Sequence, residues 1–480
     1  MFEVDSLTPI DVIAGLDDAA LVDAAAGALR MERAASARRL YAVAQLFWRR
    51  EKQLPFSERE QWRIDGWDAV AAEVAAALAI SRRRASSQIQ LAVCVWEELP
   101  KLAEVFAAGL VDYWVVSLIE SRISGLSSAD KARIDGILAR SVSRWNRLSR
   151  NKVIEKIDYW VVHIDKLAKR EERSRDQDRH VGFGPDRDGM AEIWGSVRSP
   201  AAAALDARLD ALAATVCPAD PRTKQQRRAD AVEALAAGAD RMPCCCGDAE
   251  CPAAAAIASP IVINIVADAA TVNNGAAIPG YVPGYGALPA DLVRMYVRTA
   301  KLQQVRLPSE LADCEQGYRP SSALATYVKL RDLTCRFPGC DAPAVACDID
   351  HTVAWPHGPT HPSNLKLLCR HHHLVKTFYT GPGGWSEKQQ PDGTVIWKSP
   401  TGHRYTTKPG GALFFPQFAV PTAKLELPKG PPPAAAGRTV MMPTRSRTRT
   451  ADRQARINYE RSLNRKYYQQ LREDAGPPPF

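Results

Sequence analysis

Apolar residues recur every three or four positions through most of the first three hundred residues, a spacing typical of amphipathic helices. The pattern is clear over residues 16–50, 67–80, 81–99, 100–124, 148–176, 200–216 and 222–240. Ser81 is expected to cap one helix, and Pro100 to be the first residue of the next, which Gly109 would end. The pattern predicts a mainly helical N-terminal domain.

Two shorter segments alternate between apolar and polar residues or form a continuous apolar run. Residues 180–197 alternate around Asp188 and Gly189, which predicts a β-hairpin with its turn at that dipeptide. Residues 260–268 read Pro-Ile-Val-Ile-Asn-Ile-Val-Ala-Asp and predict a single strand. A small β element is therefore expected beside the helices.

Residues 330–378 contain six of the nine histidines and four of the eleven cysteines. Cys335 and Cys340 form one close pair, and Cys369 and His372 form a second pair. Two such knuckles can supply the four ligands of a tetrahedral structural zinc. Cys347 either replaces one of these cysteines or is a small buried residue.

Four further residues in this segment are not needed by that zinc: Asp350, His351, Asn364 and His373. Residues 349–353 predict a short strand, 356–364 a loop, and 364–378 the start of a helix. Asp350 and His373 could share a catalytic divalent cation, Mg²⁺ or Mn²⁺, with positions left open for water and phosphate.

His351 and Asn364 suit two other roles in hydrolysis. A neutral imidazole at His351 can take a proton from an attacking water. Because adjacent strand residues point to opposite faces, only local bending would bring His351 and Asp350 near one phosphate. Asn364 is expected to fix the returning loop by hydrogen bonds to its backbone. His371 is expected to contact solvent or phosphate, since consecutive helical residues diverge by about 100°.

With these residues in this order, the segment resembles the HNH endonuclease family. The resemblance implies a ββα-metal fold in which His351 is the general base, Asn364 is structural, and His373 and Asp350 bind the catalytic metal. It also assigns Cys335, Cys340, Cys369 and His372 to a structural zinc, and implies DNA as the partner. Lys376 would contact a phosphate or be an ordinary surface lysine.

The rest of the chain carries a second resemblance. Residues 70–85 and 99–116, with 222–235, are similar to the helical domain of unknown function that precedes HNH modules in many actinobacterial proteins, the thirteen-E-twelve repeat group. With residues 392–409, the resemblance covers roughly residues 20–416. It implies no activity for the helical domain.

Composition sets the expected domains and compartment. With 480 residues, of which 46% are hydrophobic, two or three domains are expected. We predict a helical domain over 1–310, a nuclease domain with a following β-hairpin over 320–416, and a Pro-rich linker with a basic tail over 425–480. The acidic start lacks the features of a signal peptide, and no long uncharged apolar stretch predicts a membrane span. A cytoplasmic protein without a small-molecule cofactor is expected.

The net charge of +9 is concentrated in the tail. Residues 438–474 contain ten Lys and Arg against four Asp and Glu, and follow a Pro-rich segment. We therefore expect a disordered tail that binds nucleic acid through Arg445, Arg447 and Arg449, or else a solvated end with no partner.

A second cysteine cluster comprises Cys244, Cys245, Cys246 and Cys251. Adjacent cysteines rarely all bind one ion, so reduced loop thiols are favoured over a zinc site.

Two functions are consistent with these patterns. The first is a divalent-metal-dependent endonuclease that hydrolyses phosphodiester bonds in DNA. The alternative is a zinc-stabilised nucleic-acid-binding protein without nuclease activity, a degenerate nuclease of a mobile element.

Overall fold

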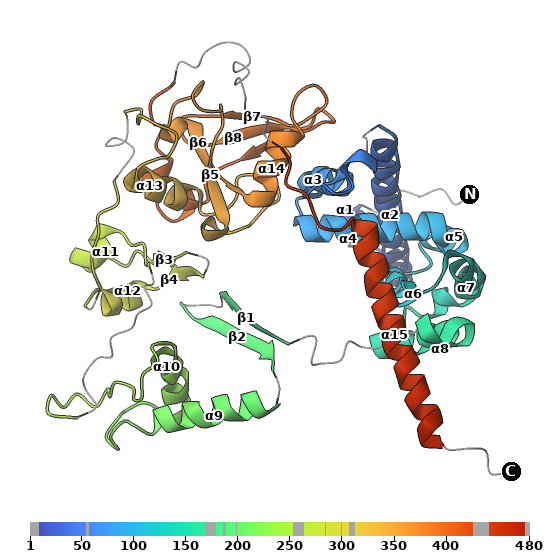
Figure 1. Ribbon diagram of the computed structural model, residues 1–480, viewed down its shortest axis with the longest axis horizontal. Helices are drawn as coiled ribbons and strands as arrows, with labels where there is room; N and C mark the ends of the chain where they lie inside the picture. Colours follow the sequence, from blue (N-terminus) through green and yellow to red (C-terminus); the bar gives the residue numbers. More distant parts are fainter. Residues whose placement is uncertain are drawn as a thin grey trace. The chain divides into compact units, whose positions relative to one another are not determined.

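The computed structural model describes residues 9–53, 57–168, 179–185, 189–197, 199–252, 264–283, 285–298, 300–306, 313–425 and 441–475 (Figure 1). The chain forms two compact units, one of Met1–Glu171 with Val305–Phe480 and the other of Glu172–Gln304. The predicted domain of residues 1–310 is thus divided between them. Within these described ranges, no helix is both long and apolar enough to cross a membrane.

The first unit begins with a bundle of helices around one apolar core. Its helices are α1 (Ile10–Ile13), α2 (Asp18–Gln53), α3 (Gly66–Leu78), α4 (Arg82–Val93), α5 (Pro100–Ala107), α6 (Tyr113–Ile123), α7 (Ser128–Ser141) and α8 (Arg150–Asp165). The Ser81 hydroxyl accepts a hydrogen bond from the Arg84 amide, and Pro100 is the first residue of α5, as predicted. Gly109, just beyond α5, has a φ of +71°, which favours glycine and ends the helix.

The same unit contains the cysteine- and histidine-rich segment. Helix α13 (Ser322–Asp332) is followed by the antiparallel pair β5 (Cys347–His351) and β6 (Leu365–Cys369), and then directly by α14 (Arg370–Phe378). A three-stranded antiparallel sheet follows, with β7 (Ser386–Gln389), β8 (Val395–Lys398) and β9 (Arg404–Thr407). Residues 365–369 were predicted to be helical. That prediction is wrong, because Leu365, Leu367 and Leu368 are buried in an extended chain paired with β5.

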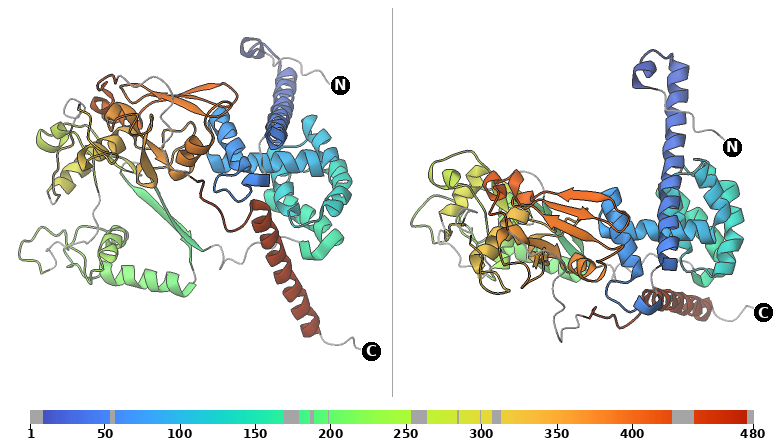
Figure 2. Two further views of the ribbon diagram at one scale, coloured as in Figure 1. Left: turned by 45° about the horizontal axis from the view of Figure 1, so that its top comes forward. Right: turned by 90° about the horizontal axis from the view of Figure 1, so that it is seen from above.

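This segment does not fold around a core of its own. Ala69, Ala72 and Ala76 of α3 share an apolar cluster with Phe337 and Trp397 of the C-terminal part. The cluster also includes Ile64, Leu368, Leu374, Val375, Tyr379, Trp385, Val395 and Met442. A shared core explains why the N-terminal helices and residues 305–480 form one unit, and Figure 2 shows α3 beside α14 in both views.

The basic tail was predicted to be disordered, but most of its described residues form a helix. Residues 426–440 and 476–480 lie outside the described residues, but Arg449–Ala475 form a single helix, α15. Arg461 of α15 forms an ion pair with Asp165 (2.6 Å), and Asn464 donates a hydrogen bond to the Leu167 carbonyl. Its residues include many strong helix formers, and partners on the helical bundle satisfy part of its charge.

The second unit combines short strands and helices. Strands β1 (His180–Pro185) and β2 (Ala191–Ser196) form the predicted hairpin, although turn residues 186–188 lie outside the described residues. Its other elements are α9 (Ser199–Ala213), α10 (Lys224–Ala236), α11 (Ala269–Asn273), β3 (Gly280–Val282), β4 (Gly286–Leu288) and α12 (Ala290–Val297). Of the strand predicted over 260–268, residues 260–263 are not described, and over 264–268 only Val266 forms a β-bridge, to Tyr281.

Candidate functional site

Four side chains gather where β6 meets α14. The Sγ atoms of Cys335, Cys340 and Cys369 and a ring nitrogen of His372 all lie within 4.8 Å of one another. The His372 Nδ1 atom is 3.5 Å from Cys335 Sγ and 3.3 Å from Cys369 Sγ. These four residues could hold a structural metal such as zinc, and they are the four that the sequence predicted.

Neighbouring groups hold this cluster in place. The imidazole of His372 stacks on the ring of Phe337, with centroids 4.1 Å apart, and the Cys369 amide donates to Cys335 Sγ. Hydrogen bonds from the thiols of Cys335 and Cys340 lower the pKa of Cys369, whereas burial raises the pKa of Cys335. Cys347 lies opposite Cys369 in the strand pair, but is not one of the four clustered residues.

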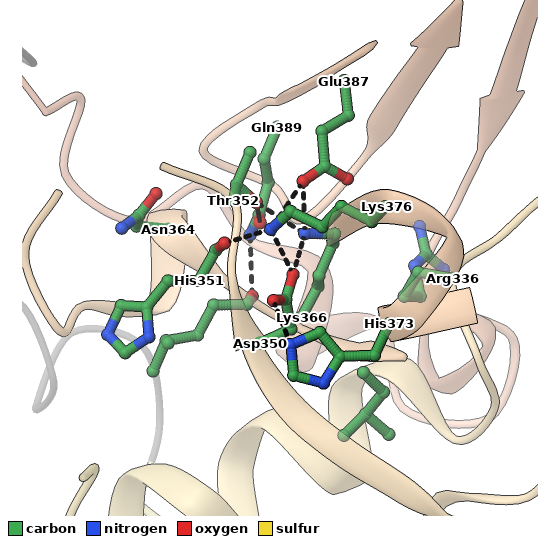
Figure 3. Close-up of polar contacts among 12 residues, drawn as sticks. Arg336, Asp350, His351, Thr352, Asn364, Lys366, His373, Lys376, Glu387 and Gln389 are labelled. Carbon is green, nitrogen blue, oxygen red and sulfur yellow. Dashed lines mark hydrogen bonds and ion pairs between the residues drawn. The ribbon is translucent and has the colours of Figure 1, made fainter. Parts of the chain in front are cut away.

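Asp350 on β5 lies at the centre of a charged network (Figure 3). Its Oδ2 atom is 2.7 Å from Lys366 Nζ on β6 and 2.6 Å from Lys376 Nζ on α14. Both ammonium groups also contact Glu387 on β7, at 2.9 and 3.0 Å. Two lysines and two carboxylates therefore balance one another inside the protein.

The pKa values follow from this arrangement. Burial would raise the pKa of Asp350, but the two lysines outweigh it and lower the pKa to about 2. Burial would likewise lower the pKa of Lys376, but Glu387 and Asp350 raise it. Asp350 is thus ionised and Lys376 is charged near neutral pH, so Lys376 is part of an ion-pair network and not an isolated surface lysine.

His373 on α14 approaches the other oxygen of the same carboxylate. Its Nε2 atom is 3.4 Å from Asp350 Oδ1, and its Nδ1 atom is 3.3 Å from Asp348 Oδ2. A histidine that binds a metal through one nitrogen commonly donates its other N–H to a carboxylate. With Asp348 in that role, Asp350 Oδ1 and His373 Nε2 form a pair of oxygen and nitrogen donors that suits one divalent cation.

His351 leaves β5 on the other face, as alternation along the strand predicts, and Figure 3 shows its ring pointing away from the Asp350 carboxylate. Its Nε2 atom is 2.9 Å from the Thr360 hydroxyl, which donates its one proton to the Gly317 carbonyl at 2.6 Å. Nε2 must then carry the imidazole proton, which leaves the Nδ1 lone pair as the acceptor. Burial lowers the pKa of His351 to about 4, so the ring is neutral at pH 7.

Aromatic side chains border this histidine. The ring of Tyr318 stacks on His351 with centroids 5.4 Å apart, and it also meets Trp355 edge to face. Tyr318 is 58% exposed and Trp355 is 40% exposed. His351 itself is buried, and the Tyr318 ring that stacks on it is exposed to solvent.

Asn364 closes the loop between β5 and β6. Its Oδ1 atom accepts a hydrogen bond from the Val353 amide, and its Nδ2 atom donates to the carbonyls of Val353 and Pro359. These are hydrogen bonds from a side chain to the loop backbone, as the sequence predicted for Asn364. Gly358 is needed here, because a Cβ at that position would lie 2.3 Å from the Val353 oxygen and 2.6 Å from Asn364 Nδ2.

The tail arginines border a cavity of about 680 Å³ on the same unit. It is lined by six arginines, Arg63, Arg82, Arg370, Arg445, Arg447 and Arg449, together with His371, Asp68 and Asp452. Arg445 and Arg449 form ion pairs with Asp65 and Asp68 at 2.6–3.1 Å, which attach the tail to the start of α3.

The remaining lining groups are less well compensated. Among the described residues, the side chains of Arg63 and Arg447 have no ion-pair partner, and His371 Nε2 is buried without a hydrogen bond. Burial, followed by the charges of His372 and Arg82, lowers the pKa of His371 to about 3. The cavity therefore offers unpaired positive charge at its rim.

Sequence reasoning missed several of these neighbours. Lys366 faces Asp350 across the strand pair. The sequence did not predict this contact, because Lys366 lies in a segment that was predicted to be helical. Glu387 comes from a later strand, and Thr360 from the loop, and neither follows a recognisable spacing. Asp348 could have been found, because it stands two residues before Asp350 and so points to the same face of the strand.

Comparison with known proteins identifies the class. Residues 27–332 match the model of the domain of unknown function DUF222, and the chain belongs to this family. No solved structure matches the chain.

Its relatives include proteins of Mycobacterium tuberculosis. The uncharacterized protein Rv3776 of strain ATCC 25618 / H37Rv is 43% identical over 491 residues, which cover 96% of this chain and 93% of the relative. The uncharacterized protein Rv2100 of the same strain is 42% identical over 524 residues, covering 100% and 93%. The uncharacterized protein in the est 3'region is 39% identical over 356 residues, covering 68% and 100%.

The cluster at the end of β6 generates a stability prediction. The free energy of zinc binding at such a site contributes directly to folding. Cys369→Ser should therefore remove one tightly bound zinc and lower the melting temperature of the first unit. Cys347→Ser is the matched control, since Cys347 lies in the same strand pair outside the cluster. Calorimetry with elemental analysis measures both effects. Equal melting temperatures and zinc contents for the two variants would contradict the prediction.

Proposed function

We propose that this protein is a divalent-metal-dependent endonuclease of the HNH type that hydrolyses phosphodiester bonds in DNA. The observation that carries the proposal is the approach of Asp350 Oδ1 and His373 Nε2 to 3.4 Å within a β5–β6–α14 unit. His351 is the last residue of β5, before the loop of that unit. Its ring is neutral, and its Nδ1 atom can accept a proton.

The roles of the chain's own residues follow from their contacts. The His351 ring points away from Asp350, so local bending of the chain has to bring both residues to one phosphate. His351 Nδ1 then accepts a proton from the attacking water, whose oxygen forms a bond to phosphorus as the bond to the leaving oxygen breaks. Thr360 holds the imidazole in the required tautomer, and Asn364 fixes the loop that carries Thr360. Asp348 orients His373 toward Asp350.

Asp350 and His373 would hold the cation. A divalent ion there would stabilise the charge that develops on the phosphate and on the leaving oxygen. Lys366 and Lys376 already neutralise Asp350 Oδ2, so the positive charge of the ion has to be offset largely by the phosphate itself. Metal binding is therefore expected to be stronger with DNA present than without it.

DNA is the partner that the surroundings favour. The arginine-lined cavity supplies cations for backbone phosphates, and the exposed rings of Tyr318 and Trp355 beside His351 suit stacking against bases. We propose that Arg445, Arg447 and Arg449 contact these phosphates. Arg445 and Arg449 also form ion pairs with Asp65, whereas Arg447 has no carboxylate partner among the described residues.

One observation favours the alternative of a zinc-stabilised nucleic-acid-binding protein without nuclease activity. Both ammonium groups around Asp350 already satisfy its charge, an arrangement that is stable without any divalent ion. In that case DNA would be bound but never cut, whichever metal is supplied.

The general-base role predicts the effect of His351→Ala. Loss of a positioned base typically costs about 10²–10⁴-fold in rate, so plasmid cleavage should fall by that factor while DNA affinity stays the same. His403→Ala is the matched control, because His403 lies at the β8–β9 turn, where its ring contacts Thr401. Supercoiled-plasmid nicking measures the rate. A His351→Ala variant that cleaves at the wild-type rate would refute the assignment.

The hydrogen-bond chain from Gly317 predicts that Thr360 positions the base. Thr360→Val removes the hydroxyl at nearly constant volume, so the proton on His351 can move to Nδ1. The rate should then fall, by at most the about 10²–10⁴-fold that a general base contributes. Thr360→Ser restores the hydroxyl and should rescue the rate. If the valine and serine variants lose activity equally, with equal melting temperatures, the tautomer argument is wrong.

The cavity predicts which arginines support DNA affinity. Arg63→Ala and Arg447→Ala should each weaken binding and reduce the slope of log affinity against log salt by about 0.9 per lost phosphate contact. Arg456→Ala is the control, because Arg456 lies on α15 but is not one of the lining residues. Fluorescence anisotropy of the His351→Ala protein at several salt concentrations gives these slopes. An equal change of slope in all three variants would show that DNA affinity depends on the overall charge of the protein and not on this cavity.

A further inference from the structure

The second unit brings Cys217 together with three cysteines of a loop about thirty residues later. The Sγ atoms of Cys217, Cys244, Cys246 and Cys251 all lie within 4.8 Å of one another, with Cys217 and Cys244 3.5 Å apart. Cys217 follows α9, and the other three belong to the loop after α10 (Figure 1). The cluster therefore ties the end of one helix to the loop beyond the next.

The structure resolves how three consecutive cysteines can contribute to one site. Cys245 is exposed and lies outside the cluster, whereas Cys244 and Cys246 on either side are partly buried within it. Successive residues of an extended loop alternate in direction, so only the outer two need to face the same point. Three adjacent cysteines thus supply two ligands, and Cys217 and Cys251 complete the set.

Hydrogen bonds that involve no cysteine side chain hold both flanks of the cluster. The Met242 amide donates to the Thr215 hydroxyl at 3.1 Å, and the Cys245 amide donates to Asp220 Oδ2 at 2.9 Å. Arg222 binds Asp220 and also donates to the Pro243 carbonyl at 2.8 Å. The two segments that carry the thiols are therefore fixed beside each other by the protein itself.

The spacing of the sulfur atoms fits a tetrahedral zinc. With a Zn–S distance of about 2.3 Å, tetrahedral geometry separates the sulfurs by about 3.8 Å. The observed upper limit of 4.8 Å requires shifts of no more than about 1 Å. A disulfide has an S–S length of about 2.05 Å, whereas the Cys217 and Cys244 sulfurs are 3.5 Å apart and all four cysteines are free thiols.

The small size of the local core gives a reason for a metal. Among the described residues, the apolar cluster of this helical pair consists of Leu212, Val216, Ala231, Ala234 and Met242, and the four cysteines adjoin it through Cys244. A segment of about fifty residues with so small a core rarely folds on hydrophobic burial alone and is commonly stabilised by a metal or disulfides.

We propose that Cys217, Cys244, Cys246 and Cys251 bind a second structural zinc, which clamps α9 to the loop after α10. This site is separate from the cluster of Cys335, Cys340, Cys369 and His372, and it does not depend on the proposed nuclease activity. The sequence alone favoured reduced loop thiols, because adjacent cysteines rarely all bind one ion. It did not point to Cys217, which stands 27 residues before Cys244.

Zinc stoichiometry of the full-length chain tests the proposal. Elemental analysis after gel filtration should find two zinc ions per wild-type chain, and one in Cys217→Ser or Cys246→Ser. Cys245→Ser is the matched control and should keep both ions, because Cys245 lies between two ligands without being one. Native mass spectrometry of Cys369→Ser should show one remaining zinc, which isolates the second site.

Three results would overturn the proposal. One is a wild-type chain with a single zinc that Cys217→Ser leaves in place. Another is a Cys217–Cys244 disulfide, found by alkylation and mass spectrometry in protein kept under reducing conditions. The third is loss of the same zinc from Cys245→Ser as from Cys246→Ser, which would show a general sensitivity of the loop and no defined ligand set.

Discussion

The position of Cys369 is the constraint on which the candidate site depends. This residue ends β6, precedes the first turn of α14, and brings its thiol into the cluster with Cys335, Cys340 and His372. Because strand and helix meet at that point without a linker, fixing Cys369 also fixes the direction in which α14 leaves the strand pair. His373 and Lys376 then reach β5, where both approach Asp350.

Buried charges make the second contribution to this geometry. Arg331 and Asp332 at the end of α13 bind each other, and they also bind the backbone that begins β6: Arg331 donates to the Leu365 carbonyl, and Asp332 accepts from the Leu367 amide. Asp350 and Glu387 in turn are compensated by Lys366 and Lys376. Removing one member of such a set leaves an uncompensated charge in a medium of low polarity, which is far more costly than losing a surface ion pair. The strand pair is therefore held from both sides.

The sequence predicted the parts of this site that depend on residue type and short spacing. The four members of the first metal cluster, the separation of Asp350 and His351 to opposite faces, and the loop-closing bonds of Asn364 all follow from local chemistry. It did not predict strand β6, because Leu365–Cys369 taken alone is compatible with a helix, and only its pairing with β5 decides. Nor did it predict helix α15, whose contacts with Asp65, Asp68 and Asp165 join residues hundreds of positions apart. Lys366, Glu387, Thr360 and Cys217 were missed for the same reason, since their roles arise from tertiary contacts.

The proposed nuclease function makes DNA cleavage dependent on a divalent metal ion, which a plasmid assay measures. Purified wild-type protein would be incubated with supercoiled plasmid in EDTA, and then with Mg²⁺ or Mn²⁺ in excess of the chelator. We expect no cleavage in EDTA and nicked or linear plasmid once either ion is supplied, because the Asp350 and His373 donors are hard and borderline ligands suited to these ions. Plasmid that is bound but stays intact with every ion, or is cut equally well in EDTA, would refute the proposed metal-dependent cleavage.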